Sequence, residues 1–124
     1  MDKLQFLLDS QEKFQKRLGQ DFPLMNEKEK SEFLHVHGYF LIEEVAEMLR
    51  ETPFHKPWKQ YNWDEEKTLS QEELQKDEAI DALHFLINIF LALGMDSEEV
   101  IERYKEKNKL NYRRQEDSSL GYIK

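Results

Sequence analysis

The chain has 124 residues, which is enough for one domain and for a core that buries roughly two thirds of the surface of the unfolded chain. Its 26 acidic and 18 basic residues give a formal net charge of -8, which argues against a general binder of nucleic acids or membrane surfaces, because their phosphate groups would be repelled. The sequence contains no cysteine, so any metal ligands must be carboxylates, histidines or carbonyls, a set that suits hard cations such as Mg²⁺.

Two helices are predicted in the N-terminal half of the chain. Apolar residues at helical spacing over residues 4–18 predict the first helix, with Gly19 at its end and Gln11 on its apolar stripe. The second helix is predicted to begin at Asn26, whose side chain can cap it, and to stop before Pro53.

An aromatic loop and a largely apolar helix follow. Residues 53–69 carry four aromatic side chains, including Trp58. Because solvated linkers rarely contain so many aromatic residues, we expect this loop to pack against the rest of the protein or to bind a ligand. A capping pattern at Ser70 predicts a third helix that continues to Gly94. Twelve of its residues 79–93 are apolar, so we expect protein to surround this helix on nearly all sides.

A fourth helix completes the predicted architecture. A second capping pattern at Asp96 opens this helix, which runs to about Arg114. The most apolar stretch, residues 79–93, is too short and too interrupted to cross a bilayer, so we expect a cytoplasmic protein. We therefore predict a single all-α domain over residues 1–124, with an architecture like that of a four-helix bundle.

Three carboxylates gather on the second predicted helix. The spacing of Glu43, Glu44 and Glu47 makes Glu44 and Glu47 project together, with Glu43 beside them. Because 35% of the chain is charged, such a cluster taken alone is more often a solvated face than a site. The third helix supplies the reason to consider a metal site.

A polar stripe runs along that otherwise apolar helix. Its members are four residues at helical spacing, Asp77, Asp81, His84 and Asn88. Glu78 and Asp81 are three residues apart, the same spacing as Glu44 and Glu47. An ionised Asp81 among apolar residues needs compensation, either from a buried Arg or Lys or from a cation shared with the second helix. The second alternative predicts a Mg²⁺ site between the second and third helices.

The C-terminal segment carries the opposite charge. Between Arg103 and Arg114 there are six basic residues and one acidic residue. One interpretation is a solvated helix that balances the acidic surface elsewhere. The other is that these side chains hold phosphate oxygens beside a metal site.

Taken together, the two acidic motifs resemble the signature of the all-α, MazG-like nucleotide pyrophosphatase superfamily, and within it the dimeric dUTPases are the most similar. The motifs are Glu43-Glu44-x-x-Glu47 and Glu78-x-x-Asp81. The further matching residues are His84 and Phe85 after the acidic pair, Trp58 within the segment HKPWK, and the C-terminal series Lys107, Asn108, Asn111, Arg114 and Tyr122. The likeness covers most of the chain.

This resemblance implies an enzyme that hydrolyses dUTP to dUMP and pyrophosphate with Mg²⁺, for which Mn²⁺ can substitute. By family position, the metal ligands are Glu44, Glu47, Glu78 and Asp81. Glu43 would then orient or deprotonate the attacking water. The metal would neutralise the charge that builds on phosphoryl oxygens, so the protein mainly has to hold the reacting groups in line.

The resemblance also implies positions for the substrate. Gln11 would read the uracil edge, because an amide both donates and accepts hydrogen bonds. Phe85 and Trp58 would stack on or wall the base, and His84 would contact the deoxyribose. The phosphate side is expected to involve four residues, Lys107, Asn111, Arg114 and Tyr122, with Asn108 as a further substrate-binding residue.

These substrate-binding assignments have structural alternatives. Gln11 would face solvent at the edge of its stripe, and Trp58, His84 and Phe85 would be ordinary core residues. The family also places a second amide shortly after the base-reading glutamine, and residues 14–16 offer no clear counterpart. Base specificity therefore stays open within the same reaction class.

The main hypothesis is a homodimeric dUTP pyrophosphatase, because so apolar a third helix in so small a chain indicates that a second subunit covers part of its surface. A near alternative is a pyrophosphatase for dCTP or a modified nucleotide. A different class is a non-catalytic helical module that binds a partner protein. Thirty residues, 48–77, separate Glu47 from Glu78, more than in compact members of the family, so we expect a loop of different shape.

Overall fold

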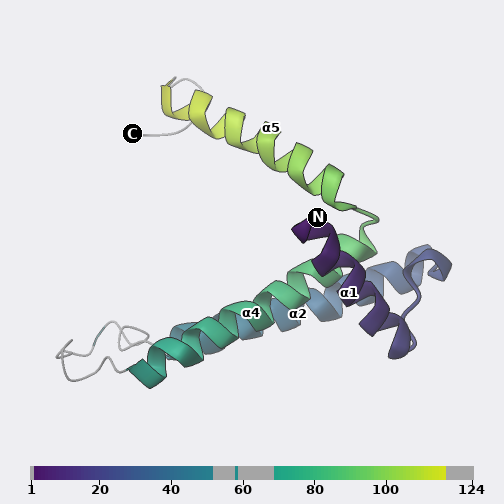
Figure 1. Cartoon of the computed structure of the whole chain (residues 1–124), viewed down its shortest axis with the longest axis horizontal. Coiled ribbons are helices and arrows are strands. Elements are labelled where there is room, and N and C mark those ends of the chain that lie inside the picture. The colour runs from purple at the N-terminus through teal and green to yellow at the C-terminus, as the bar shows by residue number, and fades with distance from the viewer. Residues whose placement is uncertain (1, 52–57, 59–68, 117–124) are drawn as a thin grey trace.

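The computed structural model describes residues 2–51, 58 and 69–116, and the described chain is helical (Figure 1). Its elements are α1 (Lys3–Arg17), the short 3₁₀ helix η1 (Phe22–Leu24), α2 (Glu27–Arg50), α4 (Leu69–Ala92) and α5 (Ser97–Glu116). These residues contain no strand. The prediction of an all-α fold with four main helices is confirmed.

The helix ends follow the predicted signals closely. The side chain of Asn26 accepts a hydrogen bond from the backbone N–H of Glu29 at 2.8 Å, and the Glu29 carboxylate accepts one from the N–H of Asn26 at 3.1 Å, as the capping pattern predicts. Asp96 caps α5 in the same way, through the N–H of Glu99 at 2.9 Å. One boundary differs, because α4 already includes Leu69, so that Ser70 lies in its first turn rather than before it.

The helices α2 and α4 form the centre of the fold. They lie side by side and run antiparallel, and α1 packs across α4 near the end of that pair which is closer to η1 (Figure 1). A small apolar core sits at that end, where Phe22 meets Phe33 edge to face with 5.1 Å between ring centroids and Ala92 closes the cluster. This arrangement places the facing surfaces of α2 and α4 next to each other along much of their length.

The helix α5 leaves this bundle. Its axis turns by 103° from that of α4, and its main tertiary contact is with α1 (Figure 1). The contact is polar: the side chain of Gln5 accepts a hydrogen bond from the backbone N–H of Ser97 at 3.0 Å, and the Ser97 hydroxyl donates to the Asp2 carboxylate. The first turn of α1 therefore caps the first turn of α5.

The expectation that protein surrounds α4 on nearly all sides is wrong for the single chain. Among the described side chains of α4, only Ile87, Asn88 and Ala92 are buried, while Ile80 and Leu93 are 52% and 56% exposed. The physical reason is that α2 and α1 cover only part of the helix, and α5 turns away instead of covering the rest. Apolar side chains of α2 and α4, among them Ile42 and Ile80, are therefore left exposed.

Within the described part of the chain, no single helix is long and apolar enough to cross a membrane, and α4 with α5 reaches that length and composition only as a pair bent by 103°.

Candidate metal and nucleotide site

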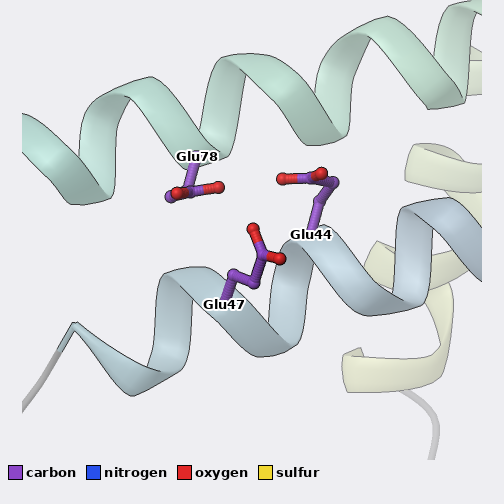
Figure 2. A group of neighbouring side chains, drawn as sticks. All are labelled: Glu44, Glu47 and Glu78. Atoms are coloured by element: carbon purple, nitrogen blue, oxygen red, sulfur yellow. The ribbon is translucent and has the colours of Figure 1, made fainter.

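Three carboxylates from two helices meet between α2 and α4 (Figure 2). Glu44 and Glu47 are one turn apart on α2 and therefore project toward the same neighbour, and Glu78 reaches them from α4. One carboxylate oxygen from each lies within 4.8 Å of the others. The antiparallel pairing of α2 and α4 thus brings together three of the four predicted metal ligands.

The cluster is short of hydrogen-bond donors. Glu44 Oε2 and Glu78 Oε2 are buried and have no hydrogen-bond partner among the described residues. No ion pair between described residues involves any of the three carboxylates. Buried carboxylate oxygens are costly unless a proton or a cation compensates them, so this cluster requires one or the other.

The electrostatics of Glu78 show the same requirement. Its pKa is raised to about 7, first because its protonated carboxyl can hydrogen-bond to Glu44, then by desolvation and by repulsion from the Glu47 carboxylate. One proton is therefore held in the cluster near neutral pH when no cation is present. A hard divalent cation fits the same three oxygen donors, because it satisfies the unpartnered oxygens and removes the repulsion.

Asp81, the fourth predicted ligand, lies apart from this group of three. Its side chain is exposed, so the premise that it is buried among apolar residues, which called for either a buried Arg or Lys partner or a cation, is wrong. It lines a cleft that Glu44 also lines. Glu44 therefore belongs both to the cluster and to the cleft that Asp81 lines, and Glu43 is exposed beside Glu44 on α2.

The cleft has a volume of about 590 Å³ and lies between α1, α2 and α4. Such a volume is in the range of small-molecule sites. Its lining comprises Gln11, Phe14, Gln15, Leu18, Gln20, His37, Phe40, Glu44, Asp81, His84, Phe85 and Asn88. The fold therefore brings the predicted residues Gln11, His84 and Phe85 to one cleft that opens beside the carboxylates.

Aromatic packing explains the position of Phe85. Its ring lies 5.3 Å from that of Phe40 and 5.8 Å from the imidazole of His37, between centroids. Phe85 is half-buried, so it belongs to an aromatic cluster and also forms part of the cleft wall. The core and the base-wall interpretations of Phe85 are both compatible with this position.

The other predicted substrate-binding residues that the structure describes do not line the cleft in the single chain. Trp58 is 76% exposed and is not among the lining residues. Four further predicted residues lie on α5, the helix that turns away from α2 and α4 (Figure 1). These are Lys107, Asn108, Asn111 and Arg114. Tyr122 lies outside the described residues.

Three polar lining residues that are buried or half-buried carry no assignment from the sequence. Gln15 is 5% exposed and lies one turn from Gln11, so a buried amide does follow the predicted base reader. Asn88 is 1% exposed, and His37 is half-buried opposite it on α2. The polar stripe on the third predicted helix pointed to Asn88, whereas nothing local distinguishes His37 from an ordinary core histidine.

Comparison with known proteins gives consistent matches. A family model described as dUTPase matches residues 3–93, the segment from α1 to the end of α4. A dCTP pyrophosphatase of Enterobacteria phage LZ5 is 30% identical over 141 residues, which cover 94% of this chain and 82% of that protein. A dCTP pyrophosphatase of Enterobacteria phage T4 is 45% identical over 42 residues, 34% of this chain and 25% of that protein. No solved structure matches the chain.

Proposed function

Because the chain belongs to the all-α dUTPase family of MazG-like nucleoside triphosphate pyrophosphatases, we propose that it hydrolyses a pyrimidine deoxynucleoside triphosphate to the monophosphate and pyrophosphate. The observation that carries this proposal is the carboxylate cluster of Glu44, Glu47 and Glu78 at the border of the cleft lined by Gln11 and Phe85. A non-catalytic helical module gives no reason for carboxylate oxygens that are buried without a hydrogen-bond partner among the described residues.

Two bases have support. The family description names dUTP, which agrees with the dUTPase-like motifs, and we propose dUTP as the first candidate. Both phage relatives are named dCTP pyrophosphatase, and this observation makes dCTP the second candidate. Uracil and cytosine differ at position 4 and at N3, so the amides of the cleft must distinguish them.

The metal would be Mg²⁺, held by Glu44, Glu47 and Glu78, with Asp81 as a fourth ligand. When bound, it supplies charge neutralisation on the phosphoryl oxygens. Glu43 is exposed beside Glu44 and is the proposed base that orients or deprotonates the attacking water. Mn²⁺ offers the same oxygen-ligand chemistry and is expected to substitute.

The base and sugar would occupy the cleft. Gln11 is the proposed reader of the base edge, Phe85 is the wall on which the base stacks, and His84 contacts the deoxyribose. Asp81 borders the same cleft near the carboxylates, so the phosphates would extend from the cleft toward the cluster. This direction follows from the position of Glu44, which lines the cleft and also belongs to the carboxylate cluster.

The phosphate side of the site needs positive charge, which α5 carries. Because α5 turns away from its own cluster, we propose a homodimer in which Lys107, Asn108, Asn111 and Arg114 are positioned by the contact between subunits. A second copy would cover exposed apolar side chains of α2 and α4, since Ile42 and Ile80 are each more than half exposed.

The test is pyrophosphate release from dUTP, dCTP, dTTP and UTP, each with and without Mg²⁺. We expect Mg²⁺-dependent release from dUTP or dCTP and much less from UTP. Release from none of the three deoxynucleotides would overturn the proposal. Preference for dCTP would keep the chemistry and replace the first candidate base with the second.

A further inference from the structure

A buried amide on α4 belongs to a residue that lines the cleft. Asn88 is among the largest fully buried side chains of the described residues and lines the cleft together with Gln11 and Gln15. Its Nδ2 lies 3.2 Å from Nδ1 of His37, across the α2 and α4 interface. The other end of the amide, Oδ1, is buried and has no hydrogen-bond partner among the described residues.

The imidazole of His37 is held firmly in this position. It stacks on Phe33 with 3.8 Å between ring centroids and an interplanar angle of 17°, and it lies edge-on to Phe40 at 5.4 Å. Burial lowers the pKa of His37, which favours the neutral ring whose unprotonated nitrogen accepts a hydrogen bond. In the structure Nδ2 of Asn88 faces that nitrogen and donates to it in the tautomer that leaves Nδ1 unprotonated, so Oδ1 is left as an acceptor.

An unpaired carbonyl oxygen in a protein interior is costly, and a ligand that donates a hydrogen bond removes the cost. We propose that Asn88 determines base specificity, with Oδ1 accepting a hydrogen bond from an N–H donor on the Watson–Crick edge of the pyrimidine. This inference rests on the proposed function, because the proposed substrate brings such a base into the cleft. His37 acts through Asn88 as a positioning residue.

The donor has two chemical sources. Uracil offers its N3–H, and cytosine offers its exocyclic amino group, while the remaining atoms of either edge are acceptors. Gln11 and Gln15, which line the same cleft, carry amides that can donate to those acceptors. A base without an N–H donor on this edge leaves Oδ1 of Asn88 unpaired, and the site rejects it.

The deoxynucleoside triphosphate of 2-pyrimidinone tests this directly, because its base keeps O2 and N3 but has neither donor. With the wild-type chain, kcat/KM for this analogue is expected to be roughly tenfold to a hundredfold below that for the natural substrate. The natural nucleotide that is hydrolysed identifies the donor, N3–H for dUTP or the amino group for dCTP. Equal rates on the analogue and the natural substrate would overturn the inference.

Two variants of Asn88 distinguish an effect on base specificity from an effect on folding. Asn88→Leu is expected to lower kcat/KM for the natural substrate until it matches that for the analogue, whereas Asn88→Asp retains an acceptor and keeps part of the preference. Gln115→Leu, the same loss of an amide at an exposed position of α5 that does not line the cleft, should leave the ratio as in the wild type.

Persistence of the wild-type ratio in folded Asn88→Leu would overturn the inference. If Asn88→Leu fails to fold, the inference is still tested by the rates of the wild type on the analogue and the natural substrate, and by the ratio of the two kcat/KM values in Asn88→Asp. If the wild type hydrolyses no natural nucleotide, the proposed function fails and this inference fails with it. If natural nucleotides are hydrolysed and the analogue equally well, only the inference fails.

Discussion

Glu78 on α4 faces Glu44 on α2 across the helix interface (Figure 2), and each has one buried carboxylate oxygen, Oε2, with no hydrogen-bond partner among the described residues. Two carboxyl groups in such proximity do not both ionise readily, and Glu47 adds a third negative charge beside them. Repulsion among these carboxylates therefore destabilises the interface between α2 and α4, and a bound cation would reduce this repulsion.

This repulsion predicts how the stability of the metal-free protein changes with pH. The pKa of Glu78 rises from 4.5 to about 7 on folding, so the folded state binds more protons than the unfolded state between these values. The contribution is fully present below pH 4.5 and is lost as the pH rises through about 7. Thermal melts with a chelator should show this loss, and Glu78→Gln should lack it. A wild-type curve that parallels that of Glu78→Gln would contradict the assignment.

Divalent metal should stabilise the folded chain. Because a ligand that binds only the native state raises the free energy of unfolding, millimolar Mg²⁺ above pH 7 is expected to raise the Tm by several degrees. Glu47→Gln should lose most of this rise, since one of the three oxygen donors becomes a neutral amide. Glu32→Gln, an exposed substitution on the same helix, provides the control and should respond to Mg²⁺ as the wild type does.

Turnover should depend on the same carboxylates. Glu47→Ala is expected to lower kcat/KM by at least about a hundredfold, because metal-ion stabilisation of the transition state is worth several kcal/mol. Helical content measured by circular dichroism should be largely retained, since the substitution relieves repulsion in the metal-free state. Near-normal activity would show that the cluster does not hold the catalytic metal.

The Asp81→Ala variant tests whether Asp81 binds the metal or only contributes to substrate binding. Asp81 is exposed at the cleft and lies outside the cluster of three, so its role as the fourth ligand depends on rearrangement when metal and substrate bind. If it is a ligand, both turnover and the Mg²⁺-induced rise in Tm should fall. A loss of turnover with an unchanged rise in Tm would instead assign Asp81 to substrate binding.

The junction of α1 and α5 should control the orientation of the basic helix. Gln5→Ala removes the acceptor for the backbone N–H of Ser97, and loss of such a cap costs about 1 kcal/mol of stability, measurable by urea unfolding. If α5 supplies the phosphate contacts, KM should also rise. Gln20→Ala, an exposed glutamine just beyond α1, is the matched control. A stability equal to that of the control would mean that this cap contributes nothing.

The homodimer can be tested on the exposed face of α2. Sedimentation at micromolar concentration should show a dimer for the wild type and a shift to monomer for Ile42→Glu, which buries a charge in the proposed contact. Leu24→Glu is the control, because Leu24 is an isolated exposed side chain in η1. A monomeric wild type would contradict the proposed assembly.

Local sequence patterns were sufficient for much of the fold. The helices and their capping residues follow from apolar spacing and from pairs such as Asn26 with Glu29, which involve neighbours along the chain. The same holds for the projection of Glu44 and Glu47 from one face, since an i, i+3 spacing brings two side chains together on any α-helix. These features depend only on helix geometry, so no tertiary information was needed.

The contacts between helices were decided only by the folded chain. That Glu78 meets Glu44, and that Asn88 meets His37, depends on the register in which α2 and α4 pack, and the long connection between them places no local restriction on it. The exposure of Asp81 and the departure of α5 from the bundle have the same origin, because burial depends on which surfaces other helices cover. Helix periodicity sets which residues share a face, whereas packing between faces sets what that face contacts.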